Sequence, residues 1–198
     1  MNSKFFLWVS LMVLSGCATL PPKNPDNLCS ILREKPDWYP AADAAYRRWG
    51  TPISVQMSIL RQESAFVADA KPPRPTILGF IPWFRSSSAY GYPQAKDETW
   101  DDYRRASGNR WASREDFADS CDFVAWYCAV SHNKLNIPFT DVDKLYFSYH
   151  EGLGGYRRQS HLAKPWLLNT AKKVQHYAKR YEAQFQQCRV DWEIGQAN

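Results

Sequence analysis

The sequence lacks the patterns by which proteins usually hold a metal ion. No two of its five cysteines have C-x-x-C spacing, and its four histidines follow no ligand spacing. It also has no internal repeat and no low-complexity tract, which excludes a repeat architecture. We therefore expect no metal site. The histidines are His132, His150, His161 and His176.

The sequence also lacks a strong excess of charge of either sign. It carries 25 Lys and Arg residues against 20 Asp and Glu residues, without a concentrated basic stripe. Because nucleic-acid binders usually carry such a stripe, we expect no nucleic-acid partner. Aromatic residues are plentiful, with nine Trp, eleven Tyr and ten Phe. Their rings can line a carbohydrate groove, although most aromatic residues in any protein fill the core.

No apolar run is long enough to span a membrane. The run FFLWVSLMVL at residues 5–14 has half of the about 20 residues that a spanning helix needs. Lys4 precedes it and Leu14-Ser15-Gly16-Cys17 follows it, which is typical of a signal peptide. The quartet resembles a bacterial lipobox, which implies cleavage before Cys17 and a lipid anchor on this residue. The alternative is an ordinary signal peptide with an incidental cysteine.

The resemblance to lipoproteins also bears on location and domain organisation. Ala18 after the cysteine implies the outer membrane of a Gram-negative envelope, with the protein facing the periplasm. Residues 1–16 are then a lipoprotein signal peptide and residues 17–27 a tether, because they are rich in Pro and Asn and have little to bury. Residues 28–198 are long enough for one domain with a real core, and we expect a monomer.

Four cysteines remain when Cys17 is set aside, an even number that agrees with export to an oxidising compartment. Cys121 and Cys128 lie seven residues apart in one predicted helix, about 10 Å along its axis, which is too far for a bond. We prefer a Cys29–Cys188 disulfide that joins the start of the domain to its last helix. The alternative is that some of the four are free buried thiols.

The body of the chain is predicted to be mainly α-helical, because no stretch shows convincing period-2 alternation. Thr51, Ser113 and Thr140 are the expected N-caps of three of the helices. Prolines interrupt residues 67–93, so we expect a long loop there, lying over the cleft, with at most a small hairpin. The helices are expected at residues 39–49, 53–64, 97–105, 113–135, 140–152 and 165–187.

Three short segments carry a resemblance to a known family. They are RQESAF at residues 61–66, SSSAYGYPQA at residues 86–95 and YFSYHEGLGGY at residues 146–156. In this order they resemble the lysozyme-like soluble lytic transglycosylases, which have Glu-Ser at a helix end, then Gly-Leu-Met-Gln, then Ala-Tyr-Asn-Ala-Gly. Glu63-Ser64 matches the first motif in full, Gly91 and Gln94 match the ends of the second, and Tyr149 and Gly152 match the third.

The resemblance covers residues 40–180 and implies a single lysozyme-like domain that cleaves peptidoglycan glycan strands without a cofactor. Such enzymes are understood to manage with one acid, here Glu63. It protonates the glycosidic oxygen between N-acetylmuramic acid and N-acetylglucosamine, and the substrate's N-acetyl group stabilises the cation. The resulting base then activates the sugar's own 6-hydroxyl, which gives a 1,6-anhydro product.

Glu63 can also be judged from its neighbours alone. It lies near the C-terminal end of a predicted helix, with Leu60 one turn back and Phe66 one turn ahead. Apolar neighbours and the negative end of the helix dipole both disfavour a carboxylate, so we expect a raised pKa, as a general acid needs. The alternative, a solvated helix residue, is favoured by the local sequence but not by the three segments together.

The remaining site residues are expected from the resemblance to surround the reacting sugar. They are Ser64, Ser88, Tyr90, Gln94, Tyr149 and His150. Tyr149 is the strongest of these, since a phenol can bridge the acid and the N-acetyl group. Ser88 as an ordinary loop residue and Gln94 as a polar residue at a helix start are the corresponding alternatives.

The sequence departs from the family pattern in two places. His150-Glu151 replaces Asn-Ala, and Glu151 would favour hydrolysis if it faced the cleft and activated a water; simple solvation is the expected alternative. The loop at residues 67–85 is longer than usual, and we hypothesise that Trp83 and Phe84 extend or cover the groove. A hydrolytic muramidase and an inactive peptidoglycan-binding lipoprotein are therefore the alternative functions.

Overall fold

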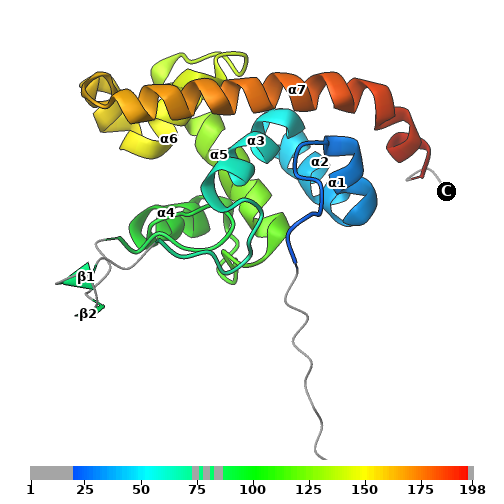
Figure 1. The fold of residues 1–198 in the computed structure, drawn as a ribbon, viewed down its shortest axis with the longest axis horizontal. Helices are drawn as coiled ribbons and strands as arrows, with labels where there is room; N and C mark the ends of the chain where they lie inside the picture. Colours follow the sequence, from blue (N-terminus) through cyan, green and yellow to red (C-terminus); the bar gives the residue numbers. More distant parts are fainter. Residues whose placement is uncertain (1–19, 73–75, 78–80, 83–86, 196–198) are drawn as a thin grey trace, which may run out of the picture.

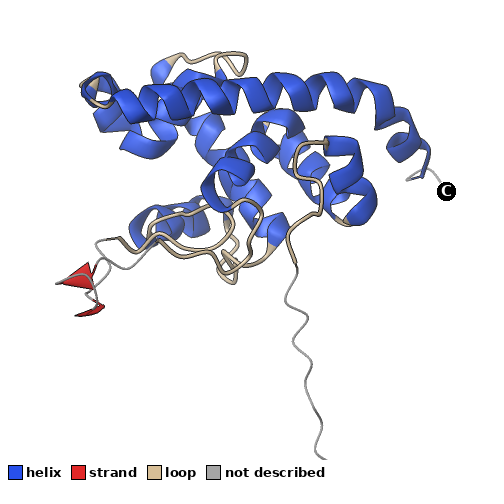
Figure 2. Ribbon diagram, viewed as in Figure 1, coloured by secondary structure: helices blue, strands red, loops and turns tan. Residues whose placement is uncertain are grey.

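The computed structural model describes residues 20–72, 76–77, 81–82 and 87–195, which form a mainly α-helical domain. The predicted signal peptide, Cys17, Trp83 and Phe84 lie outside the described residues. The elements are α1 (Leu28–Glu34), α2 (Trp38–Trp49), α3 (Ile53–Ser64), β1 (Thr76–Ile77), β2 (Ile81–Pro82), α4 (Asp97–Ser107), α5 (Phe117–Leu135), α6 (Val142–Arg157), the 3-10 turn η1 (Ser160–Ala163) and α7 (Pro165–Gly195). Figure 2 shows that helices make up nearly all of the regular structure.

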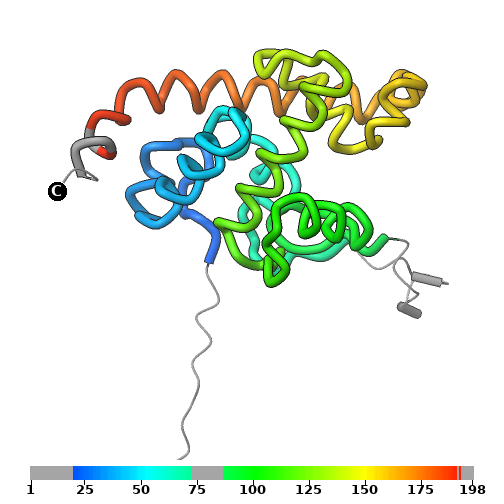
Figure 3. Tube along the Cα trace, turned by 180° about the vertical axis from the view of Figure 1, so that it is seen from behind, coloured from blue at the N-terminus to red at the C-terminus, as the bar shows by residue number. Residues whose placement is uncertain are grey.

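The core forms around α5, which packs against α2, α3 and α6. Figure 3 shows α5 rising through the middle of the molecule toward α7. Its buried residues include Phe117, Cys121, Val124 and Cys128, whereas Leu135 at its end is half-buried. Residues on several sides of α5 are buried, as expected for a helix enclosed by others.

Helix α7 runs along one side of the molecule and covers α3, α6 and α1 (Figure 1). Its buried residues recur every three or four positions, which is the spacing of one helix face. They include Leu167, Ala171, Val174, Ala178 and Tyr181. The helix continues to Gly195, eight residues beyond its predicted end at Gln187. Within the described ranges, none of the helices is long and apolar enough to cross a lipid bilayer.

The predicted disulfide is confirmed. Cys29 of α1 and Cys188 of α7 are bonded, with their Cα atoms 6.1 Å apart, while Cys121 and Cys128 are free and buried. Helix α1 itself was not predicted, because seven residues are too few for a clear period. Asn27 caps it by accepting a hydrogen bond from the backbone N–H of Ser30 at 2.9 Å.

All three predicted N-caps are wrong. Thr51 donates its hydroxyl to the carbonyl of Ala125 at 2.9 Å, and α3 begins at Ile53 after Pro52. Helix α5 is capped by Asp116 instead of Ser113, and α6 begins after Asp141 instead of Thr140. The N-cap positions are held by Pro52, Asp116 and Asp141, each of which follows the predicted residue in sequence.

The end of α6 also differs from the prediction. Gly152 has a φ of 75° and kinks the helix, which then continues to Arg157 instead of ending in the glycine-rich segment. Glycine tolerates this left-handed conformation without the steric cost that a side chain would bring.

The predicted tether contacts the domain over its last residues. Asp26 accepts hydrogen bonds from Arg61 of α3 and Arg180 of α7, each at 2.7 Å. Tyr181 of α7 donates to the carbonyl of Pro25, and the backbone N–H of Lys23 donates to Glu34 at 3.0 Å. The segment from Lys23 onward is therefore docked on the helices and is not a free linker.

The predicted hairpin is confirmed as a minimal one. Strand β1 pairs antiparallel with β2, with Thr76 opposite Pro82 and Ile77 opposite Ile81. Both strands lie beyond α4 at the edge of the molecule (Figure 1). A role of Trp83 and Phe84 in covering the groove stays a prediction.

Candidate active site

Glu63 is the penultimate residue of α3, which ends in an unusual turn. Ala65 and Phe66 both have left-handed φ angles, 51° and 63°, which non-glycine residues rarely adopt. The backbone N–H of Ala65 closes the helix on the carbonyl of Arg61 at 3.0 Å. The ring of Phe66 is fully buried and packs against Trp38, with ring centroids 5.5 Å apart. Burial of this ring offsets the strain of the turn and fixes the end of the helix that carries Glu63.

Glu63 is half-buried, and one oxygen of its carboxyl group is withdrawn from solvent. Its Oε1 atom is buried and has no hydrogen-bond partner among the described residues. Burial raises the pKa of Glu63 from 4.5 to about 7, and a hydrogen bond with Tyr146 opposes this shift only in part. Near neutral pH a large fraction of the molecules therefore carries a proton on this acid.

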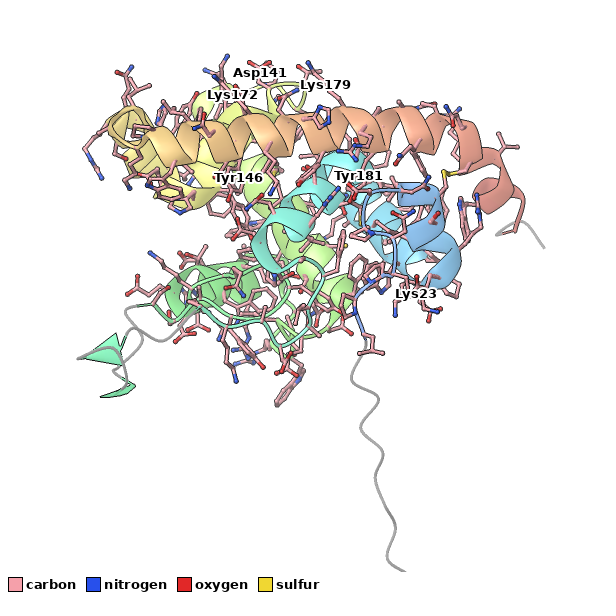
Figure 4. All side chains as sticks on the ribbon, viewed as in Figure 1. Lys23, Asp141, Tyr146, Lys172, Lys179 and Tyr181 are labelled. Atoms are coloured by element: carbon pink, nitrogen blue, oxygen red, sulfur yellow. A yellow bond between two sulfur atoms is a disulfide. The ribbon has the colours of Figure 1, made fainter. Side chains whose placement is uncertain are left out.

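Tyr146 is the direct partner of the acid, and the sequence did not single it out. It lies on α6, and Figure 4 shows it in the region between α6 and α3. Burial raises its pKa well above the usual range, and the charge of Glu63 adds to this shift. The hydroxyl therefore stays protonated and can donate to Glu63. Its position three residues before Tyr149, on the same side of one helix, was the available signal.

Tyr149 connects the third segment with the second. Its hydroxyl donates to the carbonyl of Pro93 at 2.6 Å, and its ring packs against Tyr127 and Phe123. Burial raises its pKa, and the negative charge of Glu63 contributes next. Tyr149 thus lies within electrostatic reach of the acid, as expected, but its proton is engaged with the Pro93 carbonyl.

Gln94 holds the second segment in shape. Its Nε2 donates to the carbonyls of Ala70 and Gly91, both at 2.8 Å. An amide nitrogen has two protons, so only the amide oxygen remains for a substrate. Gly91 has a φ of 75°, and a Cβ atom there would lie 2.2 Å from the carbonyl oxygen of Arg114. The backbone of this segment is therefore tightly fixed by its neighbours.

Three other predicted binding residues have partners within the protein. The hydroxyl of Ser88 accepts from the backbone N–H of Asp97 at 3.1 Å, at the start of α4. Ser64 donates to the carbonyl of Leu60 at 3.2 Å. Tyr90 donates to Glu115, and this hydrogen bond raises the pKa of Tyr90 to about 12. These contacts agree with structural roles, and contact with a substrate stays a prediction for all three.

Glu151 is locked in an ion pair and has no free oxygen. Its Oε1 lies 2.6 Å from Nζ of Lys164 and 3.0 Å from Nδ1 of His150, and its Oε2 accepts from Ser160. Burial disfavours its charge, but the hydrogen bonds from Lys164, Ser160 and His150 outweigh it and lower the pKa to about 2. A carboxylate bound in this way does not suit a base that activates water. Both expectations for Glu151 are therefore wrong: it is neither a free base in the cleft nor a solvated surface residue.

The three sequence segments therefore meet in space. Tyr146 joins the third to Glu63 in the first, and Tyr149 joins the third to Pro93 in the second. Sequence reasoning also missed Gln62, whose Oε1 is buried without a partner among the described residues.

The helical fold and the buried acid at the end of α3 define a lysozyme-like domain. The sequence profile of a family described as the transglycosylase SLT domain matches residues 5–188. The chain belongs to this family. Its members act on peptidoglycan in the cell envelope, with an activity of the lytic transglycosylase type. No curated protein matches the chain.

Proposed function

We propose that the protein is a lytic transglycosylase that cleaves the β-1,4 bond between N-acetylmuramic acid and N-acetylglucosamine. Glu63 is the general acid and then the general base. The observation that carries this proposal is a single acid, buried and with a pKa of about 7, at the place where three distant segments meet.

The reaction has two proton transfers, both at Glu63. Its carboxyl proton moves to the glycosidic oxygen as the C1–O bond breaks, and the N-acetyl oxygen of the muramic acid stabilises the developing cation. The carboxylate then accepts the proton of the 6-hydroxyl, whose oxygen bonds to C1 and forms the 1,6-anhydro ring. Between the two transfers Glu63 carries a buried negative charge, and the hydrogen bond from Tyr146 stabilises this carboxylate.

The ion pair of Glu151 favours this chemistry over hydrolysis. Most glycosidases use two carboxylates, and inverting enzymes use the second one to activate water. Glu151 is the acidic residue of α6 closest in sequence to Tyr149. Its two oxygens already bond Lys164, His150 and Ser160. The 6-hydroxyl of the substrate therefore takes the part that water plays in a lysozyme.

Digestion of purified sacculi with the wild type and with Glu63→Gln tests the proposal. We expect soluble fragments with anhydro ends from the wild type and none from the variant. Mass spectrometry distinguishes them from the reducing ends that a hydrolytic muramidase would leave. Reducing ends, or equal behaviour of the two proteins, would contradict the proposal; equal inactivity is the result expected of a binding lipoprotein.

We also propose that Cys17 carries the lipid anchor and that the protein faces the periplasm from the outer membrane. The lipobox-like quartet supports this, and Lys23, whose backbone N–H donates to Glu34, follows Cys17 closely in sequence. Membrane fractionation of cells that express the wild type or Cys17→Ala tests it. We expect the variant to lose its association with membranes, and retention of the variant would contradict the anchor.

A further inference from the structure

Trp166 is a large apolar residue that the fold leaves open to solvent close to the site. It is the second residue of α7 and is 54 % exposed. Its ring contacts the ring of His150 edge to face, with centroids 5.1 Å apart. His150 in turn lies 6.5 Å from the ring of Tyr146, the partner of Glu63. A row of rings therefore leads outward from the acid and ends in an exposed indole.

The geometry of α6 gives this row a direction. Tyr146 and His150 are four residues apart, so they lie on the same face of the helix, one turn after the other. Glu63 contacts the first of them and Trp166 contacts the second. The exposed indole is thus displaced from the acid along α6, on the side of the helix that faces Glu63.

The surroundings hold Trp166 in place. Lys164, two residues earlier, forms the ion pair with Glu151, whose side chain is only 6 % exposed. Pro165 begins α7 with a fixed φ, and Leu167 is fully buried. Glu151 also pairs with Nδ1 of His150 at 3.0 Å, so the imidazole against which the Trp166 ring packs is held by the same carboxylate. A side chain fixed in this way loses little entropy when a ligand covers it.

We propose that Trp166 is a stacking platform for a sugar of the glycan strand, one that neighbours the sugar held at Glu63. The flat apolar face of an indole suits the C–H face of a pyranose ring, and the imidazole of His150 can bond a hydroxyl at its edge. The proposal rests on the proposed function, since it takes the ligand to be a glycan. Glu151 and Lys164 are positioning residues that orient the platform.

The chain offers a matched control in Trp111. This residue is even more open, at 93 %, but it lies between α4 and α5 and has no ring contact with another described residue. If exposure alone decided glycan binding, Trp111 would matter at least as much as Trp166. The proposal predicts that only Trp166 matters for glycan binding.

Binding is measured in the Glu63→Gln background, in which no strand is cleaved. Stem-free glycan strands prepared from sacculi are titrated calorimetrically into this variant and into versions that also carry Trp166→Ala, Trp166→Phe or Trp111→Ala. We expect Trp166→Ala to weaken binding about tenfold, Trp166→Phe to restore most of it, and Trp111→Ala to change nothing. Thermal unfolding should be the same for all, because both indoles are exposed.

Equal binding by the Trp166→Ala and Trp111→Ala variants would overturn the platform. So would weaker binding of Trp166→Ala without recovery in Trp166→Phe. The outcomes are separable from those of the sacculus digest. Loss of binding on Trp166→Ala with no cleavage by the wild type would retain the platform and reject the lyase. Cleavage by the wild type with no effect of Trp166→Ala on binding would retain the lyase and reject the platform.

Discussion

Two influences set the proton affinity of Glu63, and they act in opposite directions. Burial of the carboxyl group raises its pKa, and the hydrogen bond with Tyr146 lowers it. Burial is the larger, which gives a pKa of about 7. An acid with this pKa can give a proton and take it back near neutral pH, so one residue can serve in both steps of the proposed reaction.

The first prediction concerns the pH dependence of cleavage. Because the first step needs a protonated Glu63, kcat/KM for sacculus cleavage should be level on the acid side and fall as pH rises through about 7. The fall should approach about tenfold per pH unit. Initial rates from about pH 5 to about pH 9, with circular dichroism at each pH to check folding, would measure it. A rate that climbs through this range would argue against Glu63 as the acid.

Tyr146→Phe gives a second prediction at the same site. The change removes the hydrogen bond that lowers the pKa of Glu63, so the falling limb of the profile should move to higher pH. The maximal rate should also drop, because the carboxylate loses its donor. Tyr149→Phe is the comparison, since its hydroxyl bonds to Pro93 and should leave the position of the limb nearly unchanged. Equal profiles for the two variants would contradict the assignment of Tyr146.

Gly91 and Gly108 allow backbone conformation to be separated from close packing. Both have a φ of 75°, but a Cβ atom at Gly91 would lie 2.2 Å from the Arg114 carbonyl oxygen, whereas nothing lies within 4 Å at Gly108. Gly108→Ala should therefore cost only the left-handed conformation, about 1 kcal/mol. Gly91→Ala should cost clearly more, about 3 kcal/mol or above, because the backbone must also move. Urea denaturation measures both, and similar values would contradict the close approach.

At the level of elements, helix positions could be predicted well and helix starts could not. Apolar residues recur at helical spacing over long windows such as residues 113–135, so the type of structure was evident. Thr51 has the chemistry of a cap, but its hydroxyl finds the carbonyl of Ala125 on a distant helix instead. Helix α1 escaped prediction because its seven residues depend on packing and on the bond to α7. Tertiary partners therefore decided what local propensity left open.

The disulfide joins the two elements that are farthest apart in sequence within the described domain. Cys29 and Cys188 are separated by 159 residues, and the bond holds α1 against the last part of α7. Replacing both by alanine should lower the free energy of unfolding by about 2–5 kcal/mol. Reductant should destabilise the wild type by a similar amount and leave the double variant unchanged, because Cys121 and Cys128 are already free. Guanidinium denaturation with and without reductant tests this, and a reductant effect on the double variant would speak against it.

At the scale of the whole molecule, the order of three motifs predicted where the chain would converge. It did not predict which tyrosine would contact the acid, because Tyr146 and Tyr149 share one side of α6 and only packing selects between them. The ion pair of Glu151 could not be predicted from the sequence either, because its partner Lys164 comes from the segment after the helix and only packing brings the two together. The site is thus predictable as a place, while its hydrogen bonds depend on the complete fold.

The raised pKa of Glu63 should also make the free energy of unfolding depend on pH. The pKa of Glu63 is about 7 in the folded protein and is taken as 4.5 in the unfolded chain, so folding favours the protonated form. Below pH 4.5 both states hold the proton and no cost arises. Between pH 4.5 and about 7 the unfolded state has released a proton that the folded state keeps, and the stability must fall as pH rises. The loss should reach about 3 kcal/mol at most and then level off.

Glu63→Gln isolates this contribution, because the amide has a similar shape and does not ionise. Relative to the variant, the wild type should lose stability across that interval and hold a constant difference at higher pH. Urea denaturation of both proteins at matched pH values gives the difference directly, and other titrating groups cancel in the comparison. A constant difference across the whole range would mean that Glu63 has an ordinary pKa. The same carboxyl group would then also fail as a proton donor at neutral pH, because the burial that destabilises the charged form is what keeps the proton available.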